Sequence, residues 1–417
     1  MNPSIQNKPL PFWVPVLCAA SIFVLAFGVR QSLALFIGPI NTNTGLGLGA
    51  ISLAFGFGQL MWGITQPISG ALADKFGNAK VMLVGAVMVA AGTALIPFMH
   101  SLSGLIFAMA ILGAGGAGMI GPSVLMSAVS KLTAPEKRGL ATGVVNSGGS
   151  FGQFVVLPLS AFLMSTYGWN NALIVLGIAC LLIIPLSIKL WVPSSDASSH
   201  AMSSSATSNA PPEPMSVVVK RAVKDRNFIL LSTGFFVCGF HVAFIATHLP
   251  GVIASCGLPP NVGAWTLAVV GLFNIFGSLG IGLAMNRWRL KSLLSVLYTA
   301  RAVIVLAFLM APKTEFTFIV FAAAIGLTYL STVPPTVGLV AKQFGLKYMA
   351  TLFGIVMLTH QIGGFLGATL GGKAFELTAS YNWMWYADVV LAIGAALIHL
   401  PIKEAPLKNA VAAEVAA

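Results

Sequence analysis

The chain has 417 residues, of which 57% are hydrophobic and only 8% are charged, and its formal net charge is +12. Soluble domains usually carry roughly 25% charged residues, so this composition excludes a soluble enzyme or a soluble binding module. It indicates a protein that lies in a lipid bilayer.

Twelve apolar runs follow one another along the chain, and each is long enough to cross a hydrocarbon core of about 30 Å as a helix. The first run is too long for the apolar part of a signal peptide, so we expect it to be retained. The runs predict an all-α membrane protein with twelve transmembrane helices. We expect them near residues 12–36, 49–72, 79–100, 103–128, 139–165, 170–192, 227–254, 261–284, 290–311, 315–341, 347–373 and 382–402.

The placement of the basic residues explains the net charge without nucleic acid as a partner. If the N-terminus is cytoplasmic, eighteen of the 22 lysines and arginines fall in the tails and the cytoplasmic connections. This is the positive-inside bias of membrane proteins. It predicts a multi-pass protein of the cell (inner) membrane with both termini in the cytoplasm. Arg30 and Arg301 are the two that fall within apolar runs.

A polar tract divides the chain between the sixth and seventh runs, and it reads VPSSDASSHAMSSSATSNAPPEP. Its Ser, Ala and Pro content is typical of disorder. We therefore expect an N-terminal six-helix bundle at residues 1–192, a largely disordered cytoplasmic linker at 193–226, and a C-terminal six-helix bundle at 227–417.

The two halves resemble each other in sequence. GALADKFGNAK, which follows the second run, matches GLAMNRWRLK after the eighth, and RGLATGVVNSGGSFG in the fifth run matches ATLFGIVMLTHQIGGFLG in the eleventh. An internal repeat of this kind is typical of transporters in which two pseudo-symmetric bundles rock about a central site.

These features resemble the major facilitator superfamily over essentially the whole chain. The residues from Gly70 to Lys80 are similar to the signature of that family between spans two and three, where an acid and flanking bases hold helix ends together. The resemblance implies a conformational latch, which we expect to be formed by Gly70, Asp74, Lys75 and Arg138.

Two further segments resemble one branch of the superfamily. KRGLATGVVNSG at residues 137–148 is similar to the fifth-span motif of the monocarboxylate transporters, and the eleventh run is similar to that of the oxalate/formate exchangers, which carry a substrate-binding lysine where His360 stands. The chain departs from the first pattern in span eight, where the acid and the arginine of the monocarboxylate carriers fall on Asn274 and Ser278.

Arg30 is the leading candidate for substrate contact. A charge at the bilayer centre costs at least ~3 kcal/mol, so such residues usually face a bundle interior or a wet cavity. A guanidinium offers a fork of donors that matches a carboxylate. The alternative is an arginine that pairs with neighbouring carbonyls or extends toward the membrane surface.

Three histidines within the spans are candidates for proton coupling. His241 and His248 are seven residues apart, on one face of the seventh helix, and His360 lies midway along the eleventh. A neutral imidazole donates to a bound carboxylate, and one that protonates near neutral pH carries a proton with it. The alternative is three core histidines with ordinary hydrogen bonds.

The remaining polar residues divide into binding candidates and structural ones. Arg301 and Asp388 fall on helices that usually lie at the periphery of the implied fold, and we expect a structural role for Arg301, bonded to backbone carbonyls or to Asn274. Asp388 is the clearest acid within a span, and no acid is evident on a helix expected to line the cavity. The neutral candidates for substrate binding are Gln59, Asn146, Asn274 and Tyr329.

Neither a metal nor a cofactor is expected. The four cysteines lack metal-ligand spacing, and GAGGAG at residues 113–118 lies in an apolar run without a preceding strand, where glycines favour close helix packing.

The sequence predicts a secondary transporter rather than an enzyme. The expected substrate is a small organic anion, a monocarboxylate above all, moved by alternating access with proton symport or anion exchange. We expect a monomer whose partners are the anion, protons or a counter-anion, and the bilayer. The alternative is a proton-driven efflux pump for hydrophobic or drug-like compounds; a membrane receptor that transports nothing is disfavoured by the two-half architecture.

Overall fold

The computed structural model describes residues 11–133, 138–190, 215–285, 287–344 and 349–405. These ranges are helical and contain no strand. The N-terminal half comprises α1 (Trp13–Ser32), η1 (Leu33–Phe36), α2 (Ile37–Thr44), α3 (Leu48–Phe76), α4 (Asn78–Leu95), η2 (Ile96–Phe98), α5 (Leu102–Gly113), η3 (Ala114–Met119), α6 (Pro122–Leu132), α7 (Arg138–Cys180) and α8 (Ile183–Ile188). The C-terminal half comprises α10 (Met215–Ala222), α11 (Arg226–Ser255), α12 (Pro260–Ala284), α13 (Leu290–Met310), α14 (Glu315–Thr328), α15 (Val333–Phe344), α16 (Met349–Thr378) and α17 (Asn382–His399).

The all-helical membrane fold is confirmed, and nine helices of the described ranges are long and apolar enough to cross a membrane. Several expected spans are divided or joined. α7 runs through the expected fifth and sixth spans and changes direction at Gly168, whose φ of 79° lies in the left-handed region that glycine tolerates. The expected fourth span comprises α5, the π-helical η3 and α6. The number of twelve spans stays a prediction.

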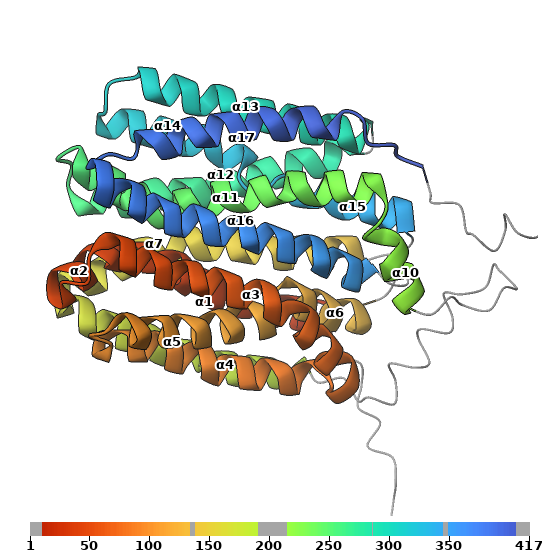
Figure 1. Cartoon of the computed structure of the whole chain (residues 1–417). Coiled ribbons are helices and arrows are strands. Elements are labelled where there is room, and N and C mark those ends of the chain that lie inside the picture. The colour runs from red at the N-terminus through yellow and green to blue at the C-terminus, as the bar shows by residue number, and fades with distance from the viewer. Residues whose placement is uncertain (1–10, 134–137, 191–214, 286, 345–348, 406–417) are drawn as a thin grey trace, which may run out of the picture.

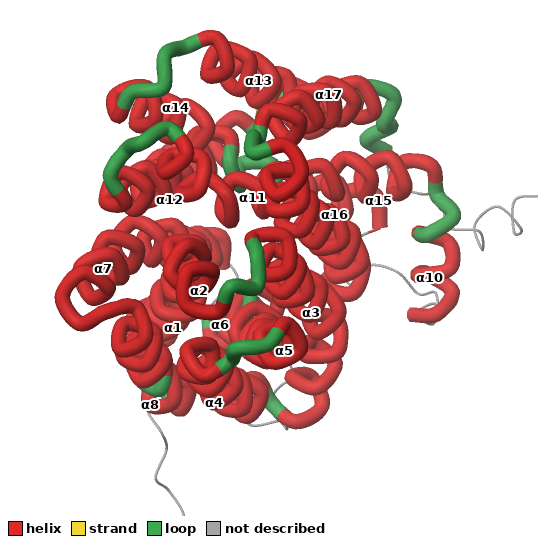
Figure 2. The backbone as a smooth tube through the Cα atoms, turned by 60° about the vertical axis from the view of Figure 1, so that its left-hand side comes forward, coloured by secondary structure: helices red, strands yellow, loops and turns green. Residues whose placement is uncertain are grey.

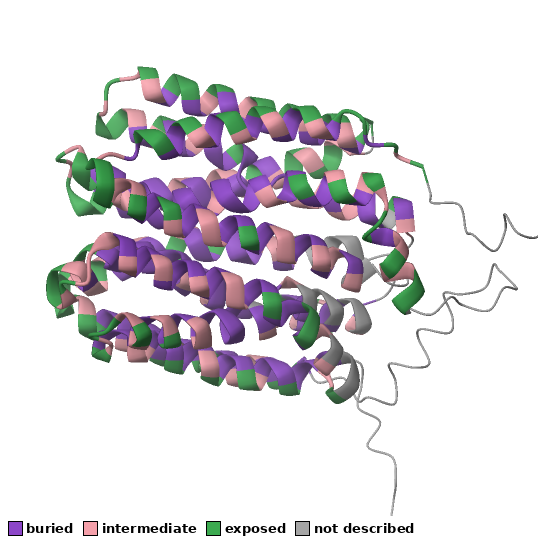
Figure 3. Cartoon of the chain, viewed as in Figure 1, coloured by how far each residue is buried: buried purple, intermediate pink, exposed green. Residues whose placement is uncertain are grey.

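The helices gather into two groups, with α1–α8 in one and α11–α17 in the other (Figures 1 and 2). One hydrophobic cluster lies mainly in the first group and two lie mainly in the second, and a few residues, Ala34, Leu157 and Ala264, extend clusters from one group to the other. Burial follows the same plan, because purple residues face the interior and green ones face outward along the helices (Figure 3). The exposed positions include large apolar side chains such as Leu283 and Met310, as expected for lipid-facing helices.

The domain boundaries stay a prediction. Linker residues 193–214 lie outside the described residues, and the rest of the predicted linker contains α10.

The two groups meet along two helix pairs. In the first, α3 and α16 run antiparallel in close contact, since a Cβ placed on Gly63 would lie 2.6 Å from Cβ of Gln361. In the second, α7 and α12 are joined by hydrogen bonds: the Gln153 amide donates to the Leu267 carbonyl at 2.8 Å. We call these two helix pairs, α3–α16 and α7–α12, the seams. Between them, residues of both halves lie near the middle of the molecule.

Candidate functional site

A cavity of about 80 Å³ lies between the two halves, and we call it the central cavity. Helices α1, α3 and α7 of one half and α11, α12 and α16 of the other contribute to its wall. None of the described residues that line it is an aspartate or a glutamate. The polar side chains of the wall belong to Arg30, Gln59, Trp62, Gln66, Asn146, Ser150, Asn274, His360 and Gln361.

Glycines place Arg30 at this cavity by drawing α1 against α7. A Cβ on Gly28 would lie 2.6 Å from Cγ2 of Val156, and one on Gly148 would lie 2.7 Å from the Ala20 carbonyl oxygen. Small residues of this kind let membrane helices approach closely. With α1 fixed against α7 on one side, the Arg30 side chain extends toward α3.

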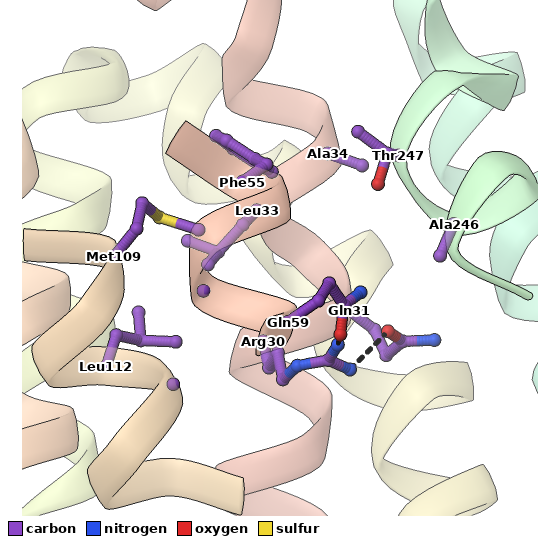
Figure 4. Close-up of a pocket in the computed structure, with 12 residues that line it drawn as sticks. Arg30, Gln31, Leu33, Ala34, Phe55, Gln59, Met109, Leu112, Ala246 and Thr247 are labelled. Carbon is purple, nitrogen blue, oxygen red and sulfur yellow. Dashed lines mark hydrogen bonds between the residues drawn. The ribbon is translucent and has the colours of Figure 1, made fainter. Parts of the chain in front are cut away.

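Among the described residues, the groups that contact the Arg30 guanidinium are neutral. It donates to the Gln59 side-chain oxygen, and its second terminal nitrogen donates to the Gln31 side-chain oxygen at 3.2 Å (Figure 4). Its Cζ lies 3.9 Å from the centroid of the Trp62 ring. Arg30 takes part in none of the ion pairs among the described residues. The positive charge of this side chain is therefore oriented but not neutralised.

A smaller void of about 30 Å³ adjoins Arg30 between α1, α3, α5 and α11. Figure 4 shows apolar side chains around it, among them Phe55, Met109 and Leu112. Arg30 and Gln59 line both spaces, so they form the wall between them.

His360 is the predicted histidine that lies at the central cavity. Its ring packs on Phe235 with centroids 4.7 Å apart, and its Nδ1 is buried without a hydrogen-bond partner among the described residues. Asn146 lines the same cavity from α7. Arg30, Gln59 and Asn146 of the N-terminal half thus line one cavity with His360 of the C-terminal half. Their role in substrate binding stays a prediction.

The structure places His241 and His248 away from this cavity. Nδ1 of His241 lies 2.9 Å from a carboxylate oxygen of Asp388 on α17, and both side chains are fully buried. Nε2 of His248 lies 2.7 Å from the Ala368 carbonyl oxygen, and its ring packs against Tyr381. His248 borders a different, wider cavity of about 1040 Å³ where α1 ends and α12 begins.

Asn274 and Tyr329 have hydrogen-bond partners within the protein. The Asn274 amide donates to the Ser150 hydroxyl at 2.8 Å and accepts from the Leu330 backbone N–H at 2.9 Å. The Tyr329 hydroxyl donates to the Val242 carbonyl at 3.0 Å. Asn274 therefore joins α12 to α7, and Tyr329 fixes α14 to α11.

Arg301 is fully buried in the C-terminal half and is held by the chain itself. Its guanidinium donates to the backbone carbonyls of Thr328 and Tyr329 and to the Cys238 sulfur at 3.5 Å. Of the two partners expected from the sequence, carbonyls and Asn274, the structure has the carbonyls. Arg301 lies outside the central cavity.

The predicted latch is described only in part. Gly70 lies near the end of α3 with open space around its α-carbon. The side chains of Asp74, Lys75 and Arg138 lie outside the described residues, so the latch stays a prediction.

Three polar residues of the wall, Trp62, Ser150 and Gln361, were not predicted from the sequence, and neither was the partner of Asp388. Trp62 follows Gln59 by three residues and so shares its helix face, and Gln361 follows His360 directly. The pairing of Asp388 with His241 had no local signal, because the two residues lie on helices far apart in the chain.

Comparisons with known proteins agree with this architecture. The family model described as Major Facilitator Superfamily matches residues 19–368 and, in a second match, residues 231–416. Two solved structures of a bacterial homolog to the human lysosomal transporter Spinster, in inward-facing occupied and unoccupied conformations, superpose with TM-scores of 0.70 and 0.72 over 94% of this chain and 97% of theirs, at 17% and 14% identity.

Curated relatives are similar over nearly their whole length. Monocarboxylate transporter 13 of Rattus norvegicus is 25% identical over 93% of this chain and 89% of its own, and the uncharacterized MFS-type transporter YcxA of Bacillus subtilis is 24% identical over 95% and 96%. The oxalate:formate antiporter of Oxalobacter formigenes is 23% identical over 89% and 86%. With the family model matched along the chain, this multi-pass membrane protein is a transporter, not an enzyme, and belongs to the major facilitator superfamily.

Proposed function

We propose that the chain carries a small organic anion, a monocarboxylate, across the cell inner membrane by alternating access. The observation that carries this proposal is the charge of the central cavity: Arg30 lies in its wall, and no described residue of that wall is acidic. The names of the relatives, monocarboxylate transporter and oxalate:formate antiporter, favour the same class of substrate.

The physical argument rests on the cost of an uncompensated charge. Away from bulk water, a cation surrounded by amides and an indole is stabilised far less than one beside an anion. A carboxylate presents two oxygens that match the guanidinium fork. An anion in the central cavity therefore compensates a charge that the protein leaves open.

The size of the cavity favours a small substrate. A volume of about 80 Å³ holds a few water molecules or one small molecule of similar bulk. Aromatic rings such as Phe23, Phe235 and Phe353 also line it, which is the feature that the efflux alternative uses. A drug-sized compound needs roughly 300 Å³ or more, which the separate cavity of about 1040 Å³ at His248 provides. The choice between the two substrate classes therefore rests on the charge of the central cavity.

His360 is our candidate for proton coupling because it lines the same cavity as Arg30. A proton that enters with the anion makes the cycle electroneutral. Exchange of one anion for another uses the same groups without net proton movement. Both modes fit the residues of the site, and the dependence of transport on pH distinguishes them.

A thermal-shift screen of the purified protein tests the substrate class. Acetate, L-lactate, pyruvate and oxalate are added separately, with ethidium as a hydrophobic cation, because a ligand stabilises the folded state that binds it. We expect a saturable rise in the unfolding temperature with at least one monocarboxylate. A rise with ethidium alone contradicts the proposal and favours efflux.

A further inference from the structure

Two hydrogen-bond donors in the wall of the central cavity have no acceptor among the described residues. They are the indole Nε1–H of Trp62 on α3 and the side-chain amide nitrogen of Gln361 on α16. Trp62 is 7% exposed and Gln361 is 1% exposed. Buried donors in folded proteins almost always have a partner, and an unmade bond of this kind costs about 1–3 kcal/mol. Two such donors at one cavity therefore indicate a missing acceptor.

The two donors come from opposite halves and line the same cavity. Their helices touch beside them, because a Cβ on Gly63, the residue after Trp62, would lie 2.6 Å from Cβ of Gln361. The Trp62 ring also lies against the Arg30 guanidinium, 3.9 Å from centroid to Cζ. Arg30, Trp62 and Gln361 thus all face the same cavity.

The chemistry of this group selects the missing partner. Arginine and indole donate hydrogen bonds and accept none, and the free atom of Gln361 is likewise a donor. An ionised carboxylate only accepts, so it satisfies all three at once. A cation whose polar groups are all N–H donors leaves these three side chains without an acceptor.

We infer that Trp62 and Gln361 are substrate-binding residues that hold one carboxylate from both halves. The Trp62 N–H donates to the carboxylate beside Arg30, and the Gln361 amide donates to the same anion from the C-terminal half. This inference rests on the proposed function. It gives the anion a structural role in transport, because a ligand bonded to α3 and to α16 draws the two halves together at the seam.

Equilibrium binding to purified protein in detergent tests the two residues separately. The variants are Trp62→Phe, which keeps an aromatic ring beside Arg30, and Gln361→Met, which keeps the shape of the side chain but lacks the donor. Trp385→Phe serves as the matched control, since Trp385 is buried on α17 outside the cavity. Isothermal titration with acetate, L-lactate and oxalate gives each Kd.

We expect Trp62→Phe and Gln361→Met each to raise the Kd of L-lactate about tenfold, as the loss of one hydrogen bond to a charged group predicts, and Trp385→Phe to leave it unchanged. Wild-type Kd values in both cavity variants overturn the inference while the proposed function stands. Failure of the wild type to bind any of the three anions overturns the proposed function instead.

A second measurement follows ligand binding to the wild-type protein directly by NMR. With ¹⁵N-labelled tryptophan, the indole signal of Trp62 is assigned by its absence in Trp62→Phe, and L-lactate is then added to the wild type. We expect a shift of the Trp62 N–H signal and none of the Trp385 signal. A saturating anion that leaves the Trp62 signal in place shows that this indole only supports Arg30, and the inference is then wrong for Trp62.

Discussion

Charged side chains inside the membrane are stabilised here in three different ways. Arg301 donates to backbone carbonyls, and Asp388 pairs with His241 in the core of the C-terminal half. Arg30 differs from both, because its partners are neutral amides beside an open cavity. This difference separates structural charges from the one available to a ligand.

Asp388→Asn tests whether the His241–Asp388 pair is structural. Loss of a buried polar partner usually costs about 1–3 kcal/mol, so we expect a lower midpoint in a denaturant titration and an unchanged Kd for L-lactate. Stability equal to wild type, together with loss of the pH dependence of uptake, would instead make this pair the site of the coupled proton, the role that the sequence suggested for His241.

His360→Gln tests proton coupling at the cavity. Glutamine keeps a donor but does not titrate, so uptake of L-lactate into proteoliposomes should vary less with external pH than in the wild type, while the Kd changes less than about threefold. His248→Gln is the control, because His248 is bonded to a backbone carbonyl outside the central cavity. An unaltered pH profile in His360→Gln would show that the proton is carried elsewhere.

At the residue scale, the sequence identified the charge but not its surroundings. Arg30 stands out because a permanent charge in an apolar run has few stable positions, and Gln59 lies on the neighbouring span. The roles of His241 and Asn274 could not be derived, since their partners Asp388 and Ser150 come from distant helices. Side-chain partners across a bundle depend on helix rotation, which hydropathy does not fix.

At the element scale, the α3–α16 seam depends on residues without bulky side chains. Gly56 faces the Thr369 hydroxyl, and a Cβ on it would lie 3.0 Å from the Phe365 carbonyl oxygen. Glycines in an apolar run indicate close helix packing, but they do not indicate the partner helix, so the contact of α3 with α16 was not predicted.

Gly56→Ala should therefore separate α3 from α16. Crowding at a packed interface usually costs about 1–3 kcal/mol, so we expect a lower unfolding temperature and slower uptake. Gly280→Ala is the control, because Gly280 on α12 has open space around its α-carbon. Equal stability of the two variants would mean that the seam adjusts without strain.

Divided spans were the main feature of the elements that hydropathy did not predict. The hydropathy pattern predicts the fourth span as one continuous helix, whereas the structure has a π-helical segment within it at Ala114–Met119. Within this segment, a Cβ placed on Gly116 would lie 2.6 Å from Cγ2 of Val89 on α4. The π-helical segment packs closely against α4 at this point. The hydropathy pattern of the sequence does not indicate such a contact.

At the scale of the whole molecule, transport requires the two halves to move relative to each other. Pro67 on α3 and Gly354 on α16 face each other where α3 approaches its end, with Cβ positions 3.9 Å apart. This separation is within the range of a disulfide. A Pro67→Cys, Gly354→Cys pair, in a background whose four native cysteines are replaced by serine, should form a cross-link that stops uptake.

Reduction with dithiothreitol should restore uptake in that variant, and each single cysteine variant should transport in both conditions. Cross-linked protein that transports at the rate of the reduced protein would show that the halves do not separate at this end of the seam.

Uptake of labelled L-lactate into proteoliposomes by the wild type and by Arg30→Ala tests the role of the unpaired cavity charge most directly. We expect saturable uptake by the wild type and a loss of about 100-fold or more in apparent affinity for Arg30→Ala, from at least two missing charge-assisted hydrogen bonds of ~1.5 kcal/mol each, with the unfolding temperature preserved. Equal affinity in the two proteins would contradict anion recognition by Arg30.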